Sequence, residues 1–146
     1  MGSIRSLLTR VQSIDYDLIK QESVEQTKDA IPELIREDLQ QGLRGDNKKI
    51  IPNYASLKYA AKKFNLNPLA GFTVPDLKLT GQFYASINVS VNRTTFTIDS
   101  SDEKAPKLEA EYGSLIYKLT DRSRSVYAIQ SLKPVLIRNL KLSIGI

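Results

Sequence analysis

The sequence contains few of the side chains that usually carry chemistry in proteins. Its 146 residues include no histidine and no cysteine, which excludes disulfides, thiol nucleophiles, cysteine-based zinc sites and every catalytic arrangement with an imidazole base. What remains is carboxylate, lysine, hydroxyl or tyrosine chemistry, or no chemistry. This composition favours a binding or structural protein over an enzyme, and we expect no cofactor and no resident metal ion.

One group of carboxylates could supply ligands for a cation. Asp99, Asp102 and Glu103 lie close together in the chain, with serines at positions 100 and 101. Their oxygens suit Ca²⁺ or Mg²⁺, but the spacing differs from the twelve-residue calcium loop, and no glycine occupies the position where that loop turns. We interpret the segment as a solvated turn before a helix, and a metal-dependent hydrolase is the most distant alternative.

Charge divides the chain into two parts. The whole sequence has 21 lysines and arginines against 16 aspartates and glutamates, a net charge of +5. Residues 1–41 have a net charge of −3, whereas residues 42–146 have a net charge of +8. An acidic front and a basic body indicate contact with an anionic partner or with a charge-complementary neighbour, such as another copy met head to tail.

Periodic apolar residues predict helices at both ends of the chain. Steps of three and four residues are typical of amphipathic helices, and the predicted helices span residues 4–19, 21–43, 54–64, 105–112 and 122–142. Pro32 predicts a kink or a fresh start inside the second helix, with Asp29 as the new N-cap. In the third helix, Leu57, Ala60, Ala61 and Phe64 are expected to face the core. Asp121 should cap the last helix and Pro134 should bend it.

Strict alternation of apolar and polar residues predicts a strand over 82–91. Residues 92–94 form the turn and residues 95–99 alternate again, which indicates a β-hairpin. A lone hairpin is marginal in water, so it must pack on helices or extend the sheet of another copy. We therefore predict a single α+β domain over 1–146, with N-terminal helices (1–43) and an α+β body (44–146) that contains the hairpin and the C-terminal helix.

Two sets of residues are candidates for contacts with partners. Apolar residues of the irregular connector 65–76 and of the first strand are predicted to form a protein interface: Leu69, Phe72, Val74, Phe83 and Tyr84. Basic residues with aromatic neighbours are predicted to meet DNA or an acidic partner: Lys58, Lys62, Lys63 and Arg93. A solvated lysine face is the alternative to the second assignment. No apolar run approaches the roughly 20 residues of a membrane-spanning helix, so no membrane contact is expected.

Residues 43–120 carry landmarks that resemble a known family. They are LQQGL at 39–43, IIPNY at 50–54, LTGQFY at 79–84, FTIDSSDEK at 96–104 and YGSLIYKLT at 112–120. Together they are similar to head–tail connector, neck or tail-completion proteins of tailed bacteriophages. The stretch covers about half of the chain, and the helical region 1–38 is less clearly covered.

The resemblance implies a structural protein of the virion neck or tail, made in the bacterial cytoplasm. Such proteins assemble as rings, here of 6 or 12 copies, between the portal, connector and tail proteins. In such a ring, the basic body is expected to face either genomic DNA in the lumen or an acidic patch on the next ring. The family brings no catalytic residues to transfer. The alternative is a small basic nucleic-acid-binding protein of phage or bacterial origin, whose affinity for DNA would fall steeply with salt.

Overall fold

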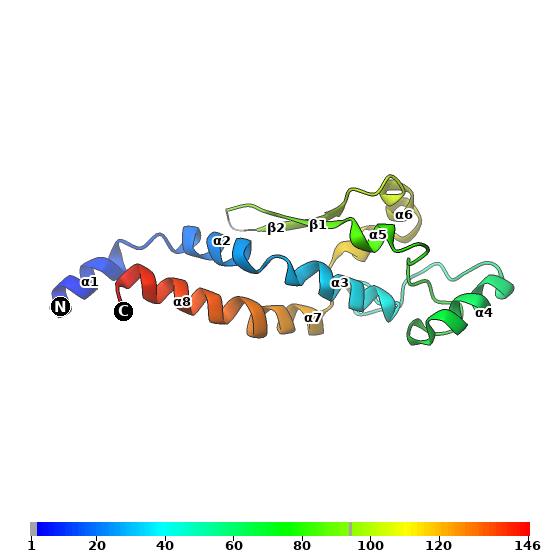
Figure 1. The fold of residues 1–146 in the computed structure, drawn as a ribbon, viewed down its shortest axis with the longest axis horizontal. Helices are drawn as coiled ribbons and strands as arrows, with labels where there is room; N and C mark the ends of the chain where they lie inside the picture. The colour runs from blue at the N-terminus through cyan, green and yellow to red at the C-terminus, as the bar shows by residue number, and fades with distance from the viewer. Residues whose placement is uncertain (1–2, 94) are drawn as a thin grey trace.

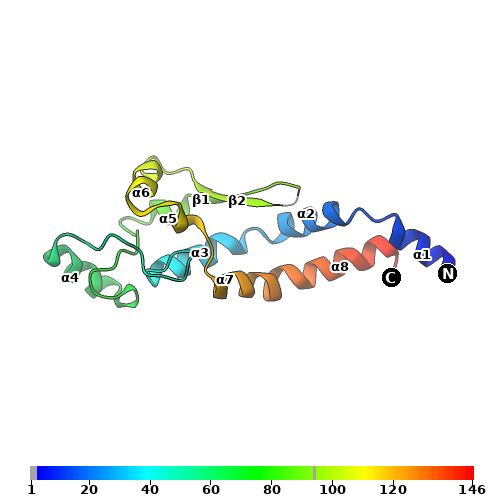
Figure 2. The ribbon, with the colours of Figure 1, turned by 180° about the vertical axis from the view of Figure 1, so that it is seen from behind.

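The fold is a long helical body with a hairpin on its side, as seen in a computed structural model that describes residues 3–93 and 95–146. Figures 1 and 2 show α1, α2 and α3 end to end, with α7 and α8 returning antiparallel beside them. Both termini lie at one end of the molecule, and α4 lies at the other. The predicted class, a single α+β domain with N-terminal helices, a central hairpin and a C-terminal helix, is confirmed.

The elements follow the chain in this order: α1 (Ile4–Gln12), α2 (Tyr16–Thr27), α3 (Ala30–Gln40), α4 (Leu57–Leu66), the 3-10 turn η1 (Pro68–Ala70), α5 (Gln82–Ala85), β1 (Ile87–Val91), β2 (Phe96–Ser100), α6 (Ala105–Tyr112), the 3-10 turn η2 (Ser114–Tyr117), α7 (Asp121–Val126), the π-helical turn η3 (Tyr127–Leu132) and α8 (Lys133–Ile144). No described helix has the length and hydropathy that crossing a bilayer requires.

The N-terminal helical region is interrupted at polar residues and at a proline, as their bonding to the backbone explains. The predicted helix over 4–19 is two helices, because the carboxylate of Asp15 accepts a hydrogen bond from the backbone N–H of Leu18 and so starts α2. The predicted fresh start near Pro32 is confirmed, since α3 begins at Ala30 and Pro32 lies in its first turn, where a missing N–H costs little. Asp29 precedes α3, but its side chain makes no capping bond.

The C-terminal segment begins one residue before the predicted cap. Thr120, rather than Asp121, is the N-cap of α7, and its hydroxyl accepts from the Ser123 N–H. The carboxylate of Asp38 on α3 accepts hydrogen bonds from Thr120 and Ser123, both of them buried. A π turn leads into α8, where Pro134 occupies the first turn and has no N–H to donate.

The hairpin is shorter than predicted. β1 and β2 pair antiparallel with Val89 opposite Ile98, and the apolar face of the pair lies against the helices, including α2 and α3. Residues 82–85 form α5 instead of strand, because Gly81 adopts a left-handed conformation (φ 88°) that turns the chain before β1 begins. Of the predicted turn, Thr94 lies outside the described residues.

The hydrophobic core is centred on α3. Ile31, Ile35 and Leu39 are at most 1% exposed. They pack with Ile50, with residues of α5 and β1, and with Ile116, Leu119 and Tyr127 from the C-terminal half. This core holds the middle of the molecule, so the two ends of the helical body extend beyond it.

Candidate interaction surface

The segment beyond α3 forms a small unit at the far end of the molecule. We define residues 47–81, which include α4 and η1, as the distal lobe. Figure 1 shows α4 of this lobe projecting past the end of α3, opposite the chain termini. Its position makes it the most protruding part of the helical body at that end, and the residues that hold it there decide which side chains it presents.

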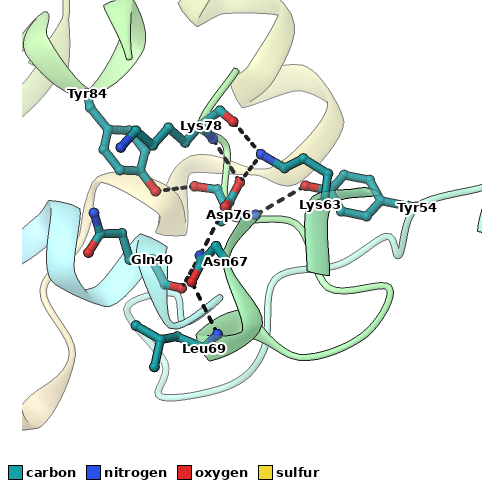
Figure 3. A network of polar contacts seen from close by, with 8 residues as sticks. All are labelled: Gln40, Tyr54, Lys63, Asn67, Leu69, Asp76, Lys78 and Tyr84. Carbon is teal, nitrogen blue, oxygen red and sulfur yellow. Dashed lines mark hydrogen bonds and ion pairs between the residues drawn. The ribbon is translucent and has the colours of Figure 1, made fainter. Parts of the chain in front are cut away.

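A buried ion pair lies at the centre of the distal lobe. The Nζ of Lys63 on α4 lies 2.7 Å from Oδ1 of Asp76, and these residues are 9% and 3% exposed. The same ammonium donates to the carbonyl of Lys78, whose own N–H donates to Asp76 Oδ1 at 3.0 Å. Figure 3 shows these groups converging on the Asp76 carboxylate. A buried charge pair needs such additional hydrogen bonds to offset its desolvation.

Polar side chains connect this ion pair to the helical body. Asn67 donates from Nδ2 to Asp76 Oδ2 at 3.0 Å and to the carbonyl of Gln40 at the end of α3 at 2.8 Å (Figure 3). Lys49 donates from Nζ to the carbonyls of Gln41 at 2.7 Å and Ala70 at 3.0 Å. These bonds satisfy the terminal carbonyls of α3 and fix the distal lobe at the end of that helix.

Two tyrosines close the network from opposite sides. The hydroxyl of Tyr84 donates to the carbonyl of Asp76, and the N–H of Asp76 donates to the hydroxyl of Tyr54 at 3.4 Å. Burial is the main cause that raises the pKa of both phenols well above the ordinary value, and the nearby Asp76 carboxylate adds to it. Both hydroxyls therefore remain protonated at neutral pH.

The network fixes α4 with a different face toward the interior from the one that the sequence predicted. Only Ala60 of the predicted buried stripe is buried, whereas Leu57 is 68% exposed and Phe64 is 38% exposed. Lys63 takes the inward position because Asp76 and the Lys78 carbonyl satisfy its charge. The prediction that Leu57, Ala60, Ala61 and Phe64 form the buried face of this helix was therefore wrong, except for Ala60.

Apolar side chains gather on the outside of the distal lobe. Leu66 is 73% exposed, Leu69 66% and Phe72 51%. Phe72 meets the ring of Phe64 edge to face, with centroids 6.0 Å apart. Several large exposed apolar side chains on one small unit are typical of a surface that another molecule covers.

The exposed charges of the distal lobe are all positive. Its one acidic residue, Asp76, is buried and paired with Lys63. Lys48, Lys58, Lys62 and Lys78 are exposed. The lobe therefore presents basic and apolar side chains together, which suits an acidic partner.

The predicted contact residues divide into four groups. Leu69 and Phe72 are exposed on the distal lobe, together with Lys58 and Lys62. Val74 is half-buried and packs toward Gly42.

Three predicted contact residues are corrected because the structure buries them. Phe83 and Tyr84, expected at an interface, are 6% and 5% exposed, since helix α5 turns both rings into the core. Lys63, expected to meet DNA, is the buried partner of Asp76.

Arg93 lies away from the other basic candidates. It stands at the hairpin turn, 3.9 Å from a carboxylate oxygen of Asp15 and 4.0 Å from one of Asp17. Figure 1 shows this turn pointing away from α4. Arg93 therefore does not share a surface with Lys58 and Lys62.

A pocket of about 430 Å³ lies between the distal lobe and α6. Tyr54, Tyr59 and Tyr112 line it, and Lys104 and Lys107 of α6 contribute positive charge. Burial raises the pKa of Tyr112 to about 12. No local sequence pattern predicts this pocket, because α6 begins 39 residues after α4 ends.

The acidic cluster after β2 does not form a cation site. Among the described residues, no group of three metal-ligating side chains is brought together, and this includes Asp99, Asp102 and Glu103. Asp102 instead accepts a hydrogen bond from the N–H of Lys104 at 2.8 Å, as expected of a turn before a helix.

Comparisons with protein-family models, curated proteins and solved structures find no significant match for this chain.

Proposed function

We propose that the chain is a structural protein of the neck or tail junction of a tailed bacteriophage, which acts by ring-forming contacts between copies. The observation that carries the proposal is the distal lobe, where Leu66, Leu69 and Phe72 are exposed on a unit held in place by buried polar bonds. The resemblance of the sequence landmarks to connector and tail-completion proteins supports the same proposal. Portal, connector and tail proteins are the proposed neighbours.

The lack of histidine and cysteine fits a role that needs no catalysis. In an oligomer, the exposed apolar surface of the lobe would be buried, at a gain of about 25 cal/mol per Å². A contact of this kind requires that the lobe keep its shape, and the Asp76 network provides that rigidity. The proposed activity is therefore assembly.

The direct test is peptide mass spectrometry on purified, nuclease-treated virions of the phage that encodes the chain. We expect a ring component at about 6 or 12 copies per particle, as a closed ring of this chain would give. Hundreds of copies would indicate the tail tube or capsid shell instead. Absence from the particle would contradict the structural role.

A second candidate function is non-specific binding of nucleic acid. The specific observation in its favour is that the exposed charges of the distal lobe are all positive, with Tyr59 beside Lys58 and Lys62. Binding of a short DNA duplex should then weaken steeply as salt rises, because counterions are released from the phosphates. Retention of duplex at moderate salt by the wild type, and its loss in Lys58→Glu/Lys62→Glu, would favour this function.

A further inference from the structure

Four exposed carboxylates lie along the N-terminal helices. Glu22 and Glu25 are three residues apart on one side of α2, Asp29 lies in the turn that follows, and Glu33 is in the first turn of α3. We call these four residues the acidic stripe. Leu18, four residues before Glu22 on the same side of α2, is nearly half exposed. The stripe thus combines negative charge with an apolar side chain, as the distal lobe combines positive charge with apolar side chains.

These two surfaces do not satisfy each other within one molecule. Glu25 pairs with its neighbour Lys28, and across the described residues no ion pair joins the acidic stripe to a lysine of the distal lobe. Figure 1 shows the reason, since α4 lies at one end of the molecule and α2 extends toward the other. Complementary surfaces that cannot meet within one copy can meet between two.

We propose that the distal lobe of one copy docks on the acidic stripe of the next. This inference rests on the proposed function and names the two surfaces that its ring contact would use. Lys58 and Lys62 would face the carboxylates of the stripe, while Leu69 and Phe72 would cover Leu18. Because the two surfaces differ, the contact is heterologous, and a heterologous contact forms rings when its rotation closes.

The experiment uses two full-length variants that each lose one surface. The lobe variant is Lys58→Glu/Lys62→Glu, and the stripe variant is Glu22→Lys/Glu33→Lys. All four positions are exposed, and circular dichroism checks that each variant is folded. Lys104→Glu/Lys107→Glu on α6 is the matched control, because it reverses two exposed lysines outside both surfaces.

Light scattering after size exclusion measures the mass of each species. The wild type and the α6 control should form the same oligomer, and each surface variant should be monomeric alone. An equimolar mixture of the two variants should assemble again, since the intact lobe of one variant fits the intact stripe of the other and the two reversed surfaces are also complementary. A single chain with all four substitutions should assemble again, because its charges are exchanged rather than removed.

Four results would overturn the inference. A stripe variant that still assembles would mean that the lobe contacts another surface. A mixture that stays monomeric would mean that the two surfaces do not meet. A wild type that is monomeric and binds DNA through Lys58 and Lys62 would make the distal lobe a nucleic-acid surface. A chain found in virions but assembled through other surfaces would overturn this inference alone, whereas absence from virions would overturn the proposed function.

Discussion

Lys62 and Lys63 are neighbours in the sequence with opposite surroundings. Lys62 is exposed on the outside of α4, whereas Lys63 is buried and bonded to Asp76 and to the carbonyl of Lys78. Adjacent side chains on an α-helix point about 100° apart around its axis. One lysine can therefore face a binding partner while the next is buried and stabilises the fold. The sequence pattern assigned both lysines to one basic group. The carboxylate that pairs with Lys63 lies thirteen residues away in an irregular segment, so no local pattern indicated the burial of Lys63.

Replacing Lys63 should therefore destabilise the protein. Lys63→Met leaves the buried Asp76 carboxylate without its counter-charge, and we expect a loss of about 3 kcal/mol in the free energy of unfolding. Lys62→Met is the matched control and should change it by less than about 0.5 kcal/mol. Urea unfolding followed by circular dichroism measures both. Equal effects of the two substitutions would contradict the burial of Lys63.

Tyrosine ionisation should limit stability at high pH. Burial raises the pKa of Tyr112 to about 12 and also raises the pKa of Tyr54 and Tyr84, whereas an unperturbed phenol ionises at 10.0. The unfolded chain therefore loses these protons first, and the free energy of unfolding should fall as the pH rises above 10. Below pH 10 this contribution is fully present.

Urea midpoints measured from about pH 9 to pH 11.5 test this dependence. The decline should become shallower in Tyr112→Phe, which removes one ionising group. Tyr16→Phe is the control, because Tyr16 is 46% exposed. An unchanged decline in Tyr112→Phe would show that its phenol ionises equally in the folded and unfolded states.

At the scale of elements, local signals located helices and turns better than strand ends. The break before α3 follows from Pro32, a property of one residue that acts on its own helix. The alternation over residues 82–91 predicted a strand that is too long. Gly81 has a left-handed φ and directly precedes α5, so the first four residues of the predicted strand are helical. A strand pattern does not reveal such a turn, since the alternation describes side chains and the turn depends on the backbone.

Gly42 joins α3 to the distal lobe through a close approach. Its φ is 68°, and an added Cβ would lie 2.6 Å from Cγ1 of Val74 and 3.2 Å from the carbonyl oxygen of Ala70. Gly81 has a similar φ of 88°, but no atom lies within 4 Å of its added Cβ. The two glycines therefore separate the cost of backbone strain from the cost of a steric clash.

Substituting each glycine by alanine should separate these costs. We expect Gly81→Ala to lower the free energy of unfolding by between about 1 and 2 kcal/mol, the cost of a left-handed residue with a Cβ. Gly42→Ala should lower it by about 3 kcal/mol, because overpacking against Val74 is added. Thermal and urea unfolding measure both variants. Similar losses would indicate that the distal lobe moves away from α3 at little cost.

At the scale of the whole molecule, the separation of charge has a structural meaning. The acidic front seen in the sequence becomes the helical side that carries Glu22 and Glu33, and part of the basic body becomes the distal lobe. The elongated shape keeps these surfaces apart (Figures 1 and 2). A compact arrangement of the same helices could have neutralised the charges internally.

Assembly through these surfaces should depend on salt. Screening shortens the range of charge interactions from about 30 Å at 0.01 M salt to about 3 Å at 1 M. The oligomer of the wild type should therefore dissociate at a higher protein concentration as sodium chloride rises, because screening weakens the contact, as measured by sedimentation velocity. The chain with exchanged charges should show the same trend. An oligomer strengthened by salt would indicate that apolar contacts alone hold it.

The sequence by itself determined the class of fold, the approximate helices, the hairpin and the division of charge. These features depend on residues a few positions apart, so periodicity and turn residues encode them directly. Only the tertiary structure decided which face of α4 is buried, that Asp38 bonds to Thr120 and Ser123, and that Thr27 meets Tyr127 across one hundred residues. Those partners are chosen by the packing of distant segments, and no local pattern carries that information.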